Sequence, residues 1–427
     1  MKKIQIGLLG LGTVGSGVWK ILHERRALLR ERAGVDLQIK KILVKHRNKK
    51  RTVSVPRRLL TDDISQILND PEIQIVVEVM GGEGASLRAV LGAIRRGKHL
   101  ITANKTLLAN EGHKIFKEAD RRQVSVGFEA SVAGGIPIIK SIREGFVGNH
   151  IQEVYGIING TSNYILSQMT ERGASFEEVL CEAQQKGYAE RNPYKDISGE
   201  DAAEKLLLLI SLCYGGWFSM KNIYVEGIHR ITPFDIQSAG ELGFVIKLLA
   251  IAKGEDSRVQ ARVHPVLVPK SHPLADVSGA FNAIFLKGDA IGPAMFYGRG
   301  AGMMPTASAV VSDIVDIAKS IDCCEARITP SLHSLAVESV DKSSNEYYFR
   351  FTVFDRPGVL GQIANCLGKN RISIASVHQR EQVKGGKVPI LVVTHKANEK
   401  DVQKAIHEID RLSVVAGKTM MIRMERF

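Results

Sequence analysis

The sequence has 427 residues, of which 44% are hydrophobic and 24% are charged, and its formal net charge is +13. This composition is typical of an ordinary globular protein of two or three domains, without repeats or low-complexity tracts. No apolar segment is long enough to span a membrane, and the scattered cysteines lack metal-ligand spacing, which favours reduced thiols in a cytoplasm. These cysteines are Cys181, Cys213, Cys323, Cys324 and Cys366.

The first predicted element is a strand that leads through a glycine turn into a helix, in residues 2–22, KKIQIGLLGLGTVGSGVWKIL. Glycines spaced G-x-G-x-x-G allow a tight turn and let backbone N–H groups approach a pyrophosphate at the head of the helix. The sequence therefore predicts a dinucleotide site, and the alternative is a glycine turn that packs helix on sheet without a ligand. The predicted cofactor-binding residues are Gly10, Gly12, Thr13, Val14 and Gly15.

A second strand is predicted at residues 36–44, and it is followed by Lys45, His46 and Arg47. A site that prefers NAD(H) usually has an acid here for the ribose, whereas cations suit a 2′-phosphate. We therefore expect NADP(H) to be preferred over NAD(H), with Lys45 and Arg47 as cofactor-binding residues. The alternative is a solvated basic loop, because residues 24–58 hold thirteen lysines and arginines but three acids. No aromatic platform or groove-reading motif accompanies this charge, so we expect no nucleic-acid partner.

The alternation of strand and helix continues with a strand at 72–82, an amphipathic helix at 86–98 and a further strand at 99–105. Ligands of open α/β sheets sit at the carboxyl ends of the strands. Asn104 and Lys105, at the tip of the last of these strands, are therefore predicted to face the cofactor.

Charged residues gather in the segment 187–206, GYAERNPYKDISGEDAAEKL, directly before a run of leucines. Ser198 and Asp201 fit a capping box, which would make these charges an ordinary helix start. However, the helical stripe through Asp201 and Lys205 continues into leucines, so this face should point into apolar surroundings. A lysine that loses water has its pKa lowered and can do acid–base work.

After a connector at residues 325–346, the remaining chain predicts the order βαββαβ, a ferredoxin-like arrangement. The strands are expected at 347–355, 372–379, 387–396 and 414–425, with a turn at 384–387 between the second and third, and the helices at 356–370 and 398–412.

Several stretches together resemble the homoserine dehydrogenase family: GLGTVG, ITANK, FEASVAGGIPII, NGTSNYIL, the segment 187–206 and GRGAGMMPTASAVVSDIVDIA. In addition, DRPGVLGQIA resembles an ACT domain, a small amino-acid-sensing module. The resemblance implies interconversion of L-aspartate 4-semialdehyde and L-homoserine, in threonine and methionine biosynthesis, by a monofunctional chain. It further implies a homodimer or homotetramer, with feedback by L-threonine. An ACT domain that only assists assembly is the alternative.

The resemblance also assigns residues. Lys205 matches the family's proton donor and Lys105 a second active-site lysine; either could move the proton, and we favour Lys205. Glu190 and Asp201 match the substrate-binding acids, and Asp196 is expected beside them, holding the lysine or the substrate. The backbone of 159–163 would receive the substrate carboxylate. Gly187 and Gly302 match positions beside the nicotinamide, although both suit simple turns. A monovalent cation, sodium or potassium, would be held by Glu129 and the carbonyl groups of Val132, Gly134 and Ile136. Without the resemblance, this last stretch would be assigned to a strand and a turn.

The predicted fold class is α/β, with a Rossmann-type dinucleotide-binding domain, an α+β substrate and dimerisation domain, and a ferredoxin-like ACT domain. The expected boundaries are 1–135, completed by about 303–325, then 136–302, a linker at 326–346 and the ACT domain at 347–427.

One departure from the family concerns Tyr194 and Lys195, where relatives often carry a neutral pair or an acid. The additional cation puts the charge balance of the site in doubt. Two other functions stay open from sequence alone: a dehydrogenase of another amino acid or semialdehyde, and a non-catalytic amino-acid sensor that presents an ACT domain.

Overall fold

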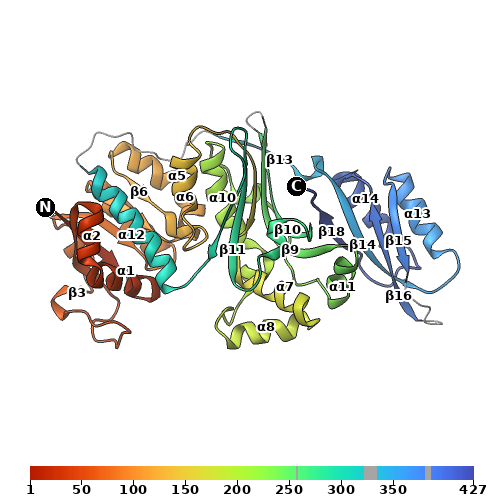
Figure 1. Ribbon diagram of the computed structural model, residues 1–427, viewed down its shortest axis with the longest axis horizontal. Helices are drawn as coiled ribbons and strands as arrows, with labels where there is room; N and C mark the ends of the chain where they lie inside the picture. The colour runs from red at the N-terminus through yellow and green to blue at the C-terminus, as the bar shows by residue number, and fades with distance from the viewer. Residues whose placement is uncertain (256–257, 322–333, 380–385) are drawn as a thin grey trace.

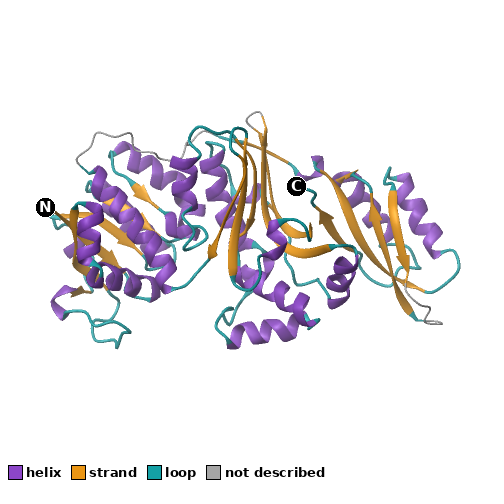
Figure 2. Ribbon diagram, in the orientation of Figure 1, coloured by secondary structure: helices purple, strands orange, loops and turns teal. Residues whose placement is uncertain are grey.

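The structure, a computed structural model, describes residues 1–255, 258–321, 334–379 and 386–427. Three units follow one another along the long axis of the molecule (Figures 1 and 2). Cys323, Cys324 and part of the turn expected at 384–387 lie outside the described residues. Across the described ranges, no helix is both long and apolar enough to cross a membrane.

The N-terminal unit is a parallel sheet in the order β3-β2-β1-β4-β5-β6, which confirms the predicted Rossmann-type domain. Its central strand is an apolar run that helices on both faces bury, as parallel sheets require. The strands are β1 (Lys2–Leu9), β2 (Val35–Leu43), β3 (Leu60–Thr61), β4 (Ile73–Glu78), β5 (His99–Thr102) and β6 (Val126–Gly127). The helices are α1 (Thr13–Glu24), α2 (Arg26–Ala33), η1 (Arg57–Leu59), α3 (Ser65–Leu68), α4 (Gly84–Arg95) and α5 (Lys105–Arg121).

A helix from much later in the chain, α12 (Met303–Ser320), returns to pack against α1 (Figure 1). Gly17 makes this close approach possible, because a Cβ atom there would lie 2.7 Å from the carbonyl oxygen of Met303. The predicted completion of the first domain extends to about residue 325, and the part of it after Ile321 lies outside the described residues.

The passage between the first two units contradicts one expectation. Residues 128–139 form a 3-10 turn and a short helix, where sequence reasoning without the family would assign a strand and a turn, so the strand is wrong. Glu129 accounts for the difference, because its carboxylate turns inward and accepts backbone N–H groups at the head of that helix. The elements are η2 (Glu129–Ser131), α6 (Ile138–Lys140) and η3 (Ser141–Gly145).

The middle unit is an antiparallel sheet in the order β12-β11-β7-β9-β10, with helices packed on one face (Figure 1). Its strands are β7 (Ile151–Ile157), β8 (Tyr224–Val225), β9 (Phe244–Glu255), β10 (Arg258–Pro269), β11 (Phe281–Gly288) and β12 (Gly292–Arg299). Its helices are α7 (Gly160–Arg172), α8 (Phe176–Gln185), α9 (Tyr194–Ser198), α10 (Glu200–Cys213), η4 (Met220–Asn222), α11 (Pro233–Glu241) and η5 (Pro273–Asp276).

The C-terminal unit has the strand order β18-β14-β16-β15 and the chain order βαββαβ, which confirms the ferredoxin-like prediction. Its elements are β14 (Ser344–Phe354), α13 (Val359–Lys369), β15 (Ile374–Gln379), β16 (Lys387–Thr394), β17 (Ala397–Asn398), α14 (Glu399–Ile409) and β18 (Met420–Met424). The connector that leads to it holds β13 (Ala336–Glu338) and η6 (Val340–Lys342).

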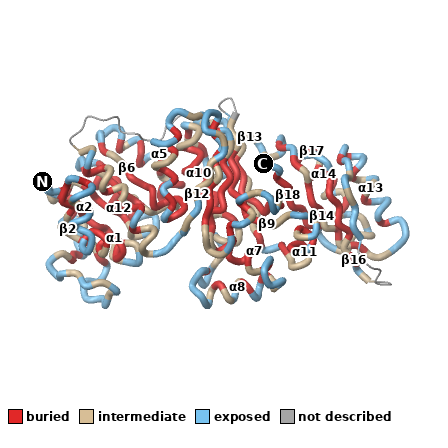
Figure 3. The backbone as a smooth tube through the Cα atoms, viewed as in Figure 1, coloured by how far each residue is buried: buried red, intermediate tan, exposed pale blue. Residues whose placement is uncertain are grey.

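The last two units share one sheet of 12 strands, because β18 pairs in parallel with β10 (Figure 2). The short strands β8 and β13 pair with other parts of the same edge of β10. The residues of β18 and most residues of β10 are accordingly buried (Figure 3). Part of the predicted linker is therefore strand.

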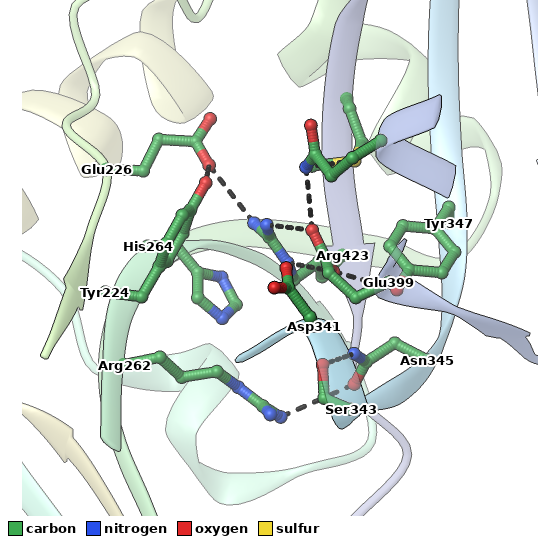
Figure 4. Close-up of polar contacts among 12 residues, drawn as sticks. Tyr224, Glu226, Arg262, His264, Asp341, Ser343, Asn345, Tyr347, Glu399 and Arg423 are labelled. Atoms are coloured by element: carbon green, nitrogen blue, oxygen red, sulfur yellow. Dashed lines mark hydrogen bonds and ion pairs between the residues drawn. The ribbon is translucent and has the colours of Figure 1, made fainter. Parts of the chain in front are cut away.

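Ionic side chains close this junction between β10 and β18. Arg423 of β18 is 1% exposed and donates to both oxygens of Glu399, at 2.9 and 2.6 Å (Figure 4). It also donates to Glu226 of the middle unit at 3.1 Å, and its guanidinium lies over the ring of Tyr224. The Arg423–Glu399 pair lies within the C-terminal unit, between β18 and α14, whereas the hydrogen bond from Arg423 to Glu226 adds an ionic link to the middle unit beside the backbone pairing.

Candidate active site

The glycine turn lies where the sequence predicts it, between β1 and α1. Gly10 has a φ of +104°, and a Cβ atom on Gly15 would lie 2.2 Å from the carbonyl oxygen of Gly10. Helix α1 begins after Gly12 without a side-chain cap, so no side chain among the described residues caps the N–H groups of its first turn, which include those of Thr13 and Val14. This cradle of small residues and backbone donors fits the pyrophosphate of a dinucleotide.

The basic loop after β2 is exposed, and Lys45 and Arg47 form no ion pair with any residue that the structure describes. Arg51 instead closes the loop by donating to the carbonyl groups of His46 and Arg47, at 2.5 and 3.1 Å. Lys45, Arg47 and Arg57 line one hollow beside β3. The charges of Lys45 and Arg47 are therefore not neutralised by acids of the described residues and are exposed for a ligand.

The carboxyl end of β5 carries the side chains predicted to face the cofactor. Asn104 caps α5 by accepting from Leu107, and its amide donates to the carbonyl group of Gly82 at 2.6 Å. Lys105 follows as the first residue of α5 and points toward the middle unit, where its Nζ lies 3.2 Å from Asp201 Oδ1.

Asp201 is the centre of the site, because two lysines and one amide converge on its carboxylate. Lys205 Nζ donates to Asp201 Oδ2 at 2.6 Å and to the carbonyl group of Ile158 at 2.7 Å. Burial alone would raise the pKa of Asp201, but the charges of Lys205 and Lys105 hold it well below its usual value. A carboxylate is thus kept ionised between two ammonium groups.

Asn159, at the N-cap of α7, joins the two predicted acids. Its Nδ2 donates to Asp196 at 2.7 Å and to Asp201 at 2.8 Å, while its Oδ1 accepts from Ser162. Burial raises the pKa of Asp196, and the hydrogen bond from Asn159 opposes this rise. Sequence reasoning considered only the backbone of 159–163 and missed this side chain.

The lowered pKa that the sequence predicts for the buried lysine, Lys205, is not seen at the second active-site lysine, Lys105. Burial does act in that direction, but the negative charge of Asp201 outweighs it and raises the pKa of Lys105 above its ordinary value. The Lys105 amine is therefore held as an ammonium.

The capping box predicted from Ser198 is also wrong. Gly199, with a φ of +89°, ends α9 and serves as the N-cap of α10. The Asp201 side chain is consequently available to the lysines instead of the backbone.

The additional cation, Lys195, is paired with a residue that sequence reasoning missed. Its Nζ donates to Glu204 of α10 at 2.8 Å, and the other oxygen of Glu204 accepts from the Thr106 hydroxyl at 2.8 Å. The charge that seemed unbalanced in the sequence is therefore matched. The spacing of Asp201 and Glu204, one helical turn apart, is the signal that could have indicated a second inward acid.

Three predicted residues, Glu190, Gly187 and Gly302, remain apart from this cluster. Glu190 and Gly187 are exposed in the loop before α9, and the Glu190 carboxylate makes no hydrogen bond or ion pair with the described residues. Gly302, at the head of α12, has a φ of +122°. It belongs to a loop that lies against residues 134–135, since Gly135 donates to the carbonyl group of Arg299 at 3.0 Å.

The predicted cation loop is buried. Glu129, 3% exposed, accepts from the backbone N–H groups of Ile139 and Lys140 at 2.8 Å each, and burial raises its pKa. The Ile136 carbonyl group already accepts from Ile138 at 2.8 Å, whereas no hydrogen bond from a described residue is found at the Val132 and Gly134 carbonyl groups. A buried carboxylate without a paired cation among the described side chains fits a cation better than a neutral ligand.

In this structure a lysine that follows β5 of a Rossmann-type sheet contacts buried carboxylates of a second domain. This arrangement defines a nicotinamide-dependent dehydrogenase. Family models agree along the chain: residues 10–129 match the NAD-binding domain of homoserine dehydrogenase, 137–315 match homoserine dehydrogenase and 347–413 match the ACT domain. The chain belongs to the homoserine dehydrogenase family.

Curated relatives align over the full chain. A homoserine dehydrogenase of Synechocystis is 44% identical over 435 residues, covering 99% of both proteins. One of Neisseria gonorrhoeae is 41% identical over 432 residues, covering 100% of this chain and 99% of the relative. Among solved structures, a homoserine dehydrogenase from Thiobacillus denitrificans is 42% identical, with a TM-score of 0.92 over 100% of this chain and 99% of the other. A hyperthermophilic archaeal homoserine dehydrogenase in complex with NADPH, 23% identical, shares the fold over 74% of this chain and 98% of its own length, with a TM-score of 0.62.

The activity of this family is NAD(P)-dependent interconversion of L-homoserine and L-aspartate 4-semialdehyde, an oxidoreduction at a CH–OH group. The presence of an ACT domain is consistent with regulation by an amino acid.

Proposed function

We propose that Lys205 moves the proton of this reaction and that Asp201 and Lys105 keep it in position. The observation that carries the proposal is the buried arrangement in which Lys205 and Lys105 both bind Asp201, next to the carboxyl end of β5. The nicotinamide, when bound, exchanges a hydride with the substrate carbon. In the reducing direction, the Lys205 ammonium gives a proton to the oxygen that was the aldehyde; in the oxidising direction, the neutral amine removes it from the hydroxyl group.

The carboxylates are proposed to bind the amino-acid end of the substrate. Asp196 and Asp201 have the sign required for an α-ammonium group, and Asn159 holds the two together. Glu190 belongs to the same proposed set on the strength of the family resemblance. The backbone of residues 159–163 is the proposed partner of the substrate carboxylate; within it, the N–H groups of Ser162 and Asn163 already donate to Asn159.

An assay with purified protein tests this function. L-Homoserine with NADP⁺ or NAD⁺ should give reduced cofactor, followed by its absorbance. If neither cofactor is reduced with homoserine, but another amino alcohol or semialdehyde reacts, the substrate assignment is wrong and the alternative dehydrogenase is favoured.

We propose further that NADP(H) is preferred over NAD(H), with Lys45 and Arg47 receiving the 2′-phosphate. Both cations are exposed and border one hollow, which supports this role. That NADPH is the ligand in the archaeal structure agrees with it.

Replacing Lys45 and Arg47 together with alanine should raise the KM for NADP⁺ roughly tenfold or more, because each charge-assisted hydrogen bond contributes about 1.5–3 kcal/mol. The KM for NAD⁺, which lacks the phosphate, should not change. A matched control replaces Lys49 and Lys50, which lie farther along the same exposed loop. Equal effects on both cofactors, or an equal effect of the control, would identify the segment as a solvated basic loop.

A monovalent cation is proposed to lie at Glu129 and the carbonyl groups of Val132, Gly134 and Ile136, where it would have a structural role. The buried carboxylate supports this site. Heat denaturation in choline chloride, sodium chloride and potassium chloride at equal ionic strength should show a higher Tm in one of the metal salts, through mass action.

Feedback by L-threonine through the C-terminal unit, a cytoplasmic location and a homodimer or homotetramer complete the proposal. The face of the middle sheet opposite the helices supports assembly, since it leaves Tyr297 exposed and Phe281, Phe285 and Met295 half-buried. Activity assays with and without threonine test the feedback, and sedimentation analysis measures the oligomeric state.

A further inference from the structure

Glu204 of α10 contacts both of the units between which the site lies. The residue is 7% exposed, and one oxygen of its carboxylate accepts a hydrogen bond from the Thr106 hydroxyl, in the first turn of α5, at 2.8 Å. The other oxygen accepts from Lys195 Nζ, in α9, at 2.8 Å. Helix α5 belongs to the Rossmann-type unit, whereas α9 and α10 belong to the middle unit, so this one carboxylate connects elements of both.

The connection lies directly beside the proposed catalytic groups. Thr106 follows Lys105 in the chain, and the Lys105 amine lies 3.2 Å from Asp201 of α10. Two adjacent residues at the start of α5 therefore hold two acids one turn apart on α10, Asp201 and Glu204. Fixing Thr106 at Glu204 limits how far the backbone of Lys105 can move from Asp201.

Glu204 also balances charge. Three amines, those of Lys105, Lys195 and Lys205, surround Asp201 and Glu204. The hydrogen bond to Glu204 raises the pKa of Lys195 above its ordinary value. Glu204 is in addition one of the acids that oppose the effect of burial on the pKa of Lys105, although Asp201 contributes more. Without Glu204, Lys195 would be a third cation competing for a single carboxylate.

We propose that Glu204 is a positioning residue of the dehydrogenase site: it holds Lys105 against Asp201 across the domain boundary and keeps Lys195 away from Asp201. This inference rests on the proposed roles of Lys105, Asp201 and Lys205. Glu204 itself is not assigned a contact with substrate or cofactor.

Three variants of the full chain separate its two contacts. Glu204→Ala removes both, Thr106→Val removes one hydroxyl at nearly constant volume, and Glu204→Gln keeps an acceptor for Thr106 while removing the charge. We expect Glu204→Ala to lower kcat about 10–100-fold, because misplacement of a catalytic group by about 1 Å can cost 10²-fold. Thr106→Val should lower kcat about 2–10-fold, as expected for one hydrogen bond. The double variant Glu204→Ala/Thr106→Val should have a kcat no lower than that of Glu204→Ala alone. In all these variants, the KM for NADP⁺ should stay within about twofold of that of the unmodified protein.

The pH dependence provides a readout that a merely structural residue would not change. In Glu204→Gln, the basic limb of the kcat/KM profile in the reducing direction should move to lower pH, because loss of a nearby negative charge makes the ammonium groups of the cluster, including that of the proposed donor Lys205, easier to deprotonate. Adding Lys195→Ala to Glu204→Gln removes the uncompensated cation and should return the limb toward that of the unmodified protein. An unchanged profile in Glu204→Gln, or full activity of Glu204→Ala, would overturn the proposal.

A second readout does not depend on turnover. Limited acylation of the folded protein, followed by peptide mass spectrometry, measures how fast each lysine amine reacts. Lys105 should be modified faster in Glu204→Ala and in Thr106→Val, while Lys186, which pairs with Glu182 on α8, should react at an unchanged rate. Equal Lys105 rates in all proteins would contradict the positioning role even if no homoserine activity were found. In contrast, absence of homoserine activity with faster Lys105 labelling would count against the proposed function alone.

Discussion

Replacing Lys205 with alanine is expected to lower kcat about 10²–10⁴-fold in both directions, the range contributed by a positioned general acid or base. The Lys205 amine is the proposed proton donor and binds Asp201 and the Ile158 carbonyl group. Because these contacts lie in the middle unit, binding of NADPH to the Rossmann-type unit, measured by fluorescence titration, should change less than about twofold.

Lys186→Ala is a suitable control, because it removes an exposed lysine of the same unit that pairs with Glu182. Lys105→Ala distinguishes the two active-site amines: it should weaken homoserine binding and slow turnover, but less than Lys205→Ala. If Lys105→Ala slowed turnover more than Lys205→Ala, the role of proton donor would be assigned to Lys105. Unchanged turnover in Lys205→Ala would remove the proton-donor assignment altogether.

Replacing Arg423 with methionine is expected to reduce the free energy of unfolding by about 3–5 kcal/mol, because it leaves a buried carboxylate without its partner. Glu399, which receives two hydrogen bonds from Arg423, is 1% exposed and could not be solvated in the folded state. Chemical denaturation, with coincident transitions checked by two probes, measures the change.

The matched control is Arg426→Met, three residues farther along, where the arginine side chain is 64% exposed and its guanidinium pairs with Glu346. Exposed pairs of this kind contribute less than about 1 kcal/mol. Combining Arg423→Met with Glu399→Gln should recover part of the lost stability, because the buried charge is then removed as well. Equal stabilities of Arg423→Met and the unmodified protein would show that stability does not depend on the ionic partners of Arg423, Glu399 within the C-terminal unit and Glu226 across the junction.

The features that the sequence predicted well are those that local pattern determines. The turn at Gly10 requires a positive φ, and the alternation of strand and helix after it leaves few topologies for a parallel sheet. Asp201 and Lys205 are four residues apart on one helix, so their pairing could be read directly from helical spacing.

The features that the sequence did not predict depend on contacts between distant segments. Thr106 and Glu204 are separated by 98 positions, and nothing in either segment specifies the other. Similarly, no local pattern indicates that Asn159 joins Asp196 to Asp201, or that Ser198 leaves its capping role to Gly199. Glu190 is the opposite case: the family resemblance predicts a substrate-binding role, but this exposed side chain makes no contact with the described residues that would indicate it.

The parallel pairing of β18 with β10 has a consequence for synthesis of the protein. On the ribosome, β18 emerges after every other strand described here, so the N–H and C=O groups of β10 opposite Arg423 and Met424 remain without their strand until then. Open strand edges are sites of wrong association between chains. The nascent polypeptide therefore carries this open edge from the time β10 emerges until β18 is synthesised and docks, and wrong pairing with another chain competes with folding during that interval.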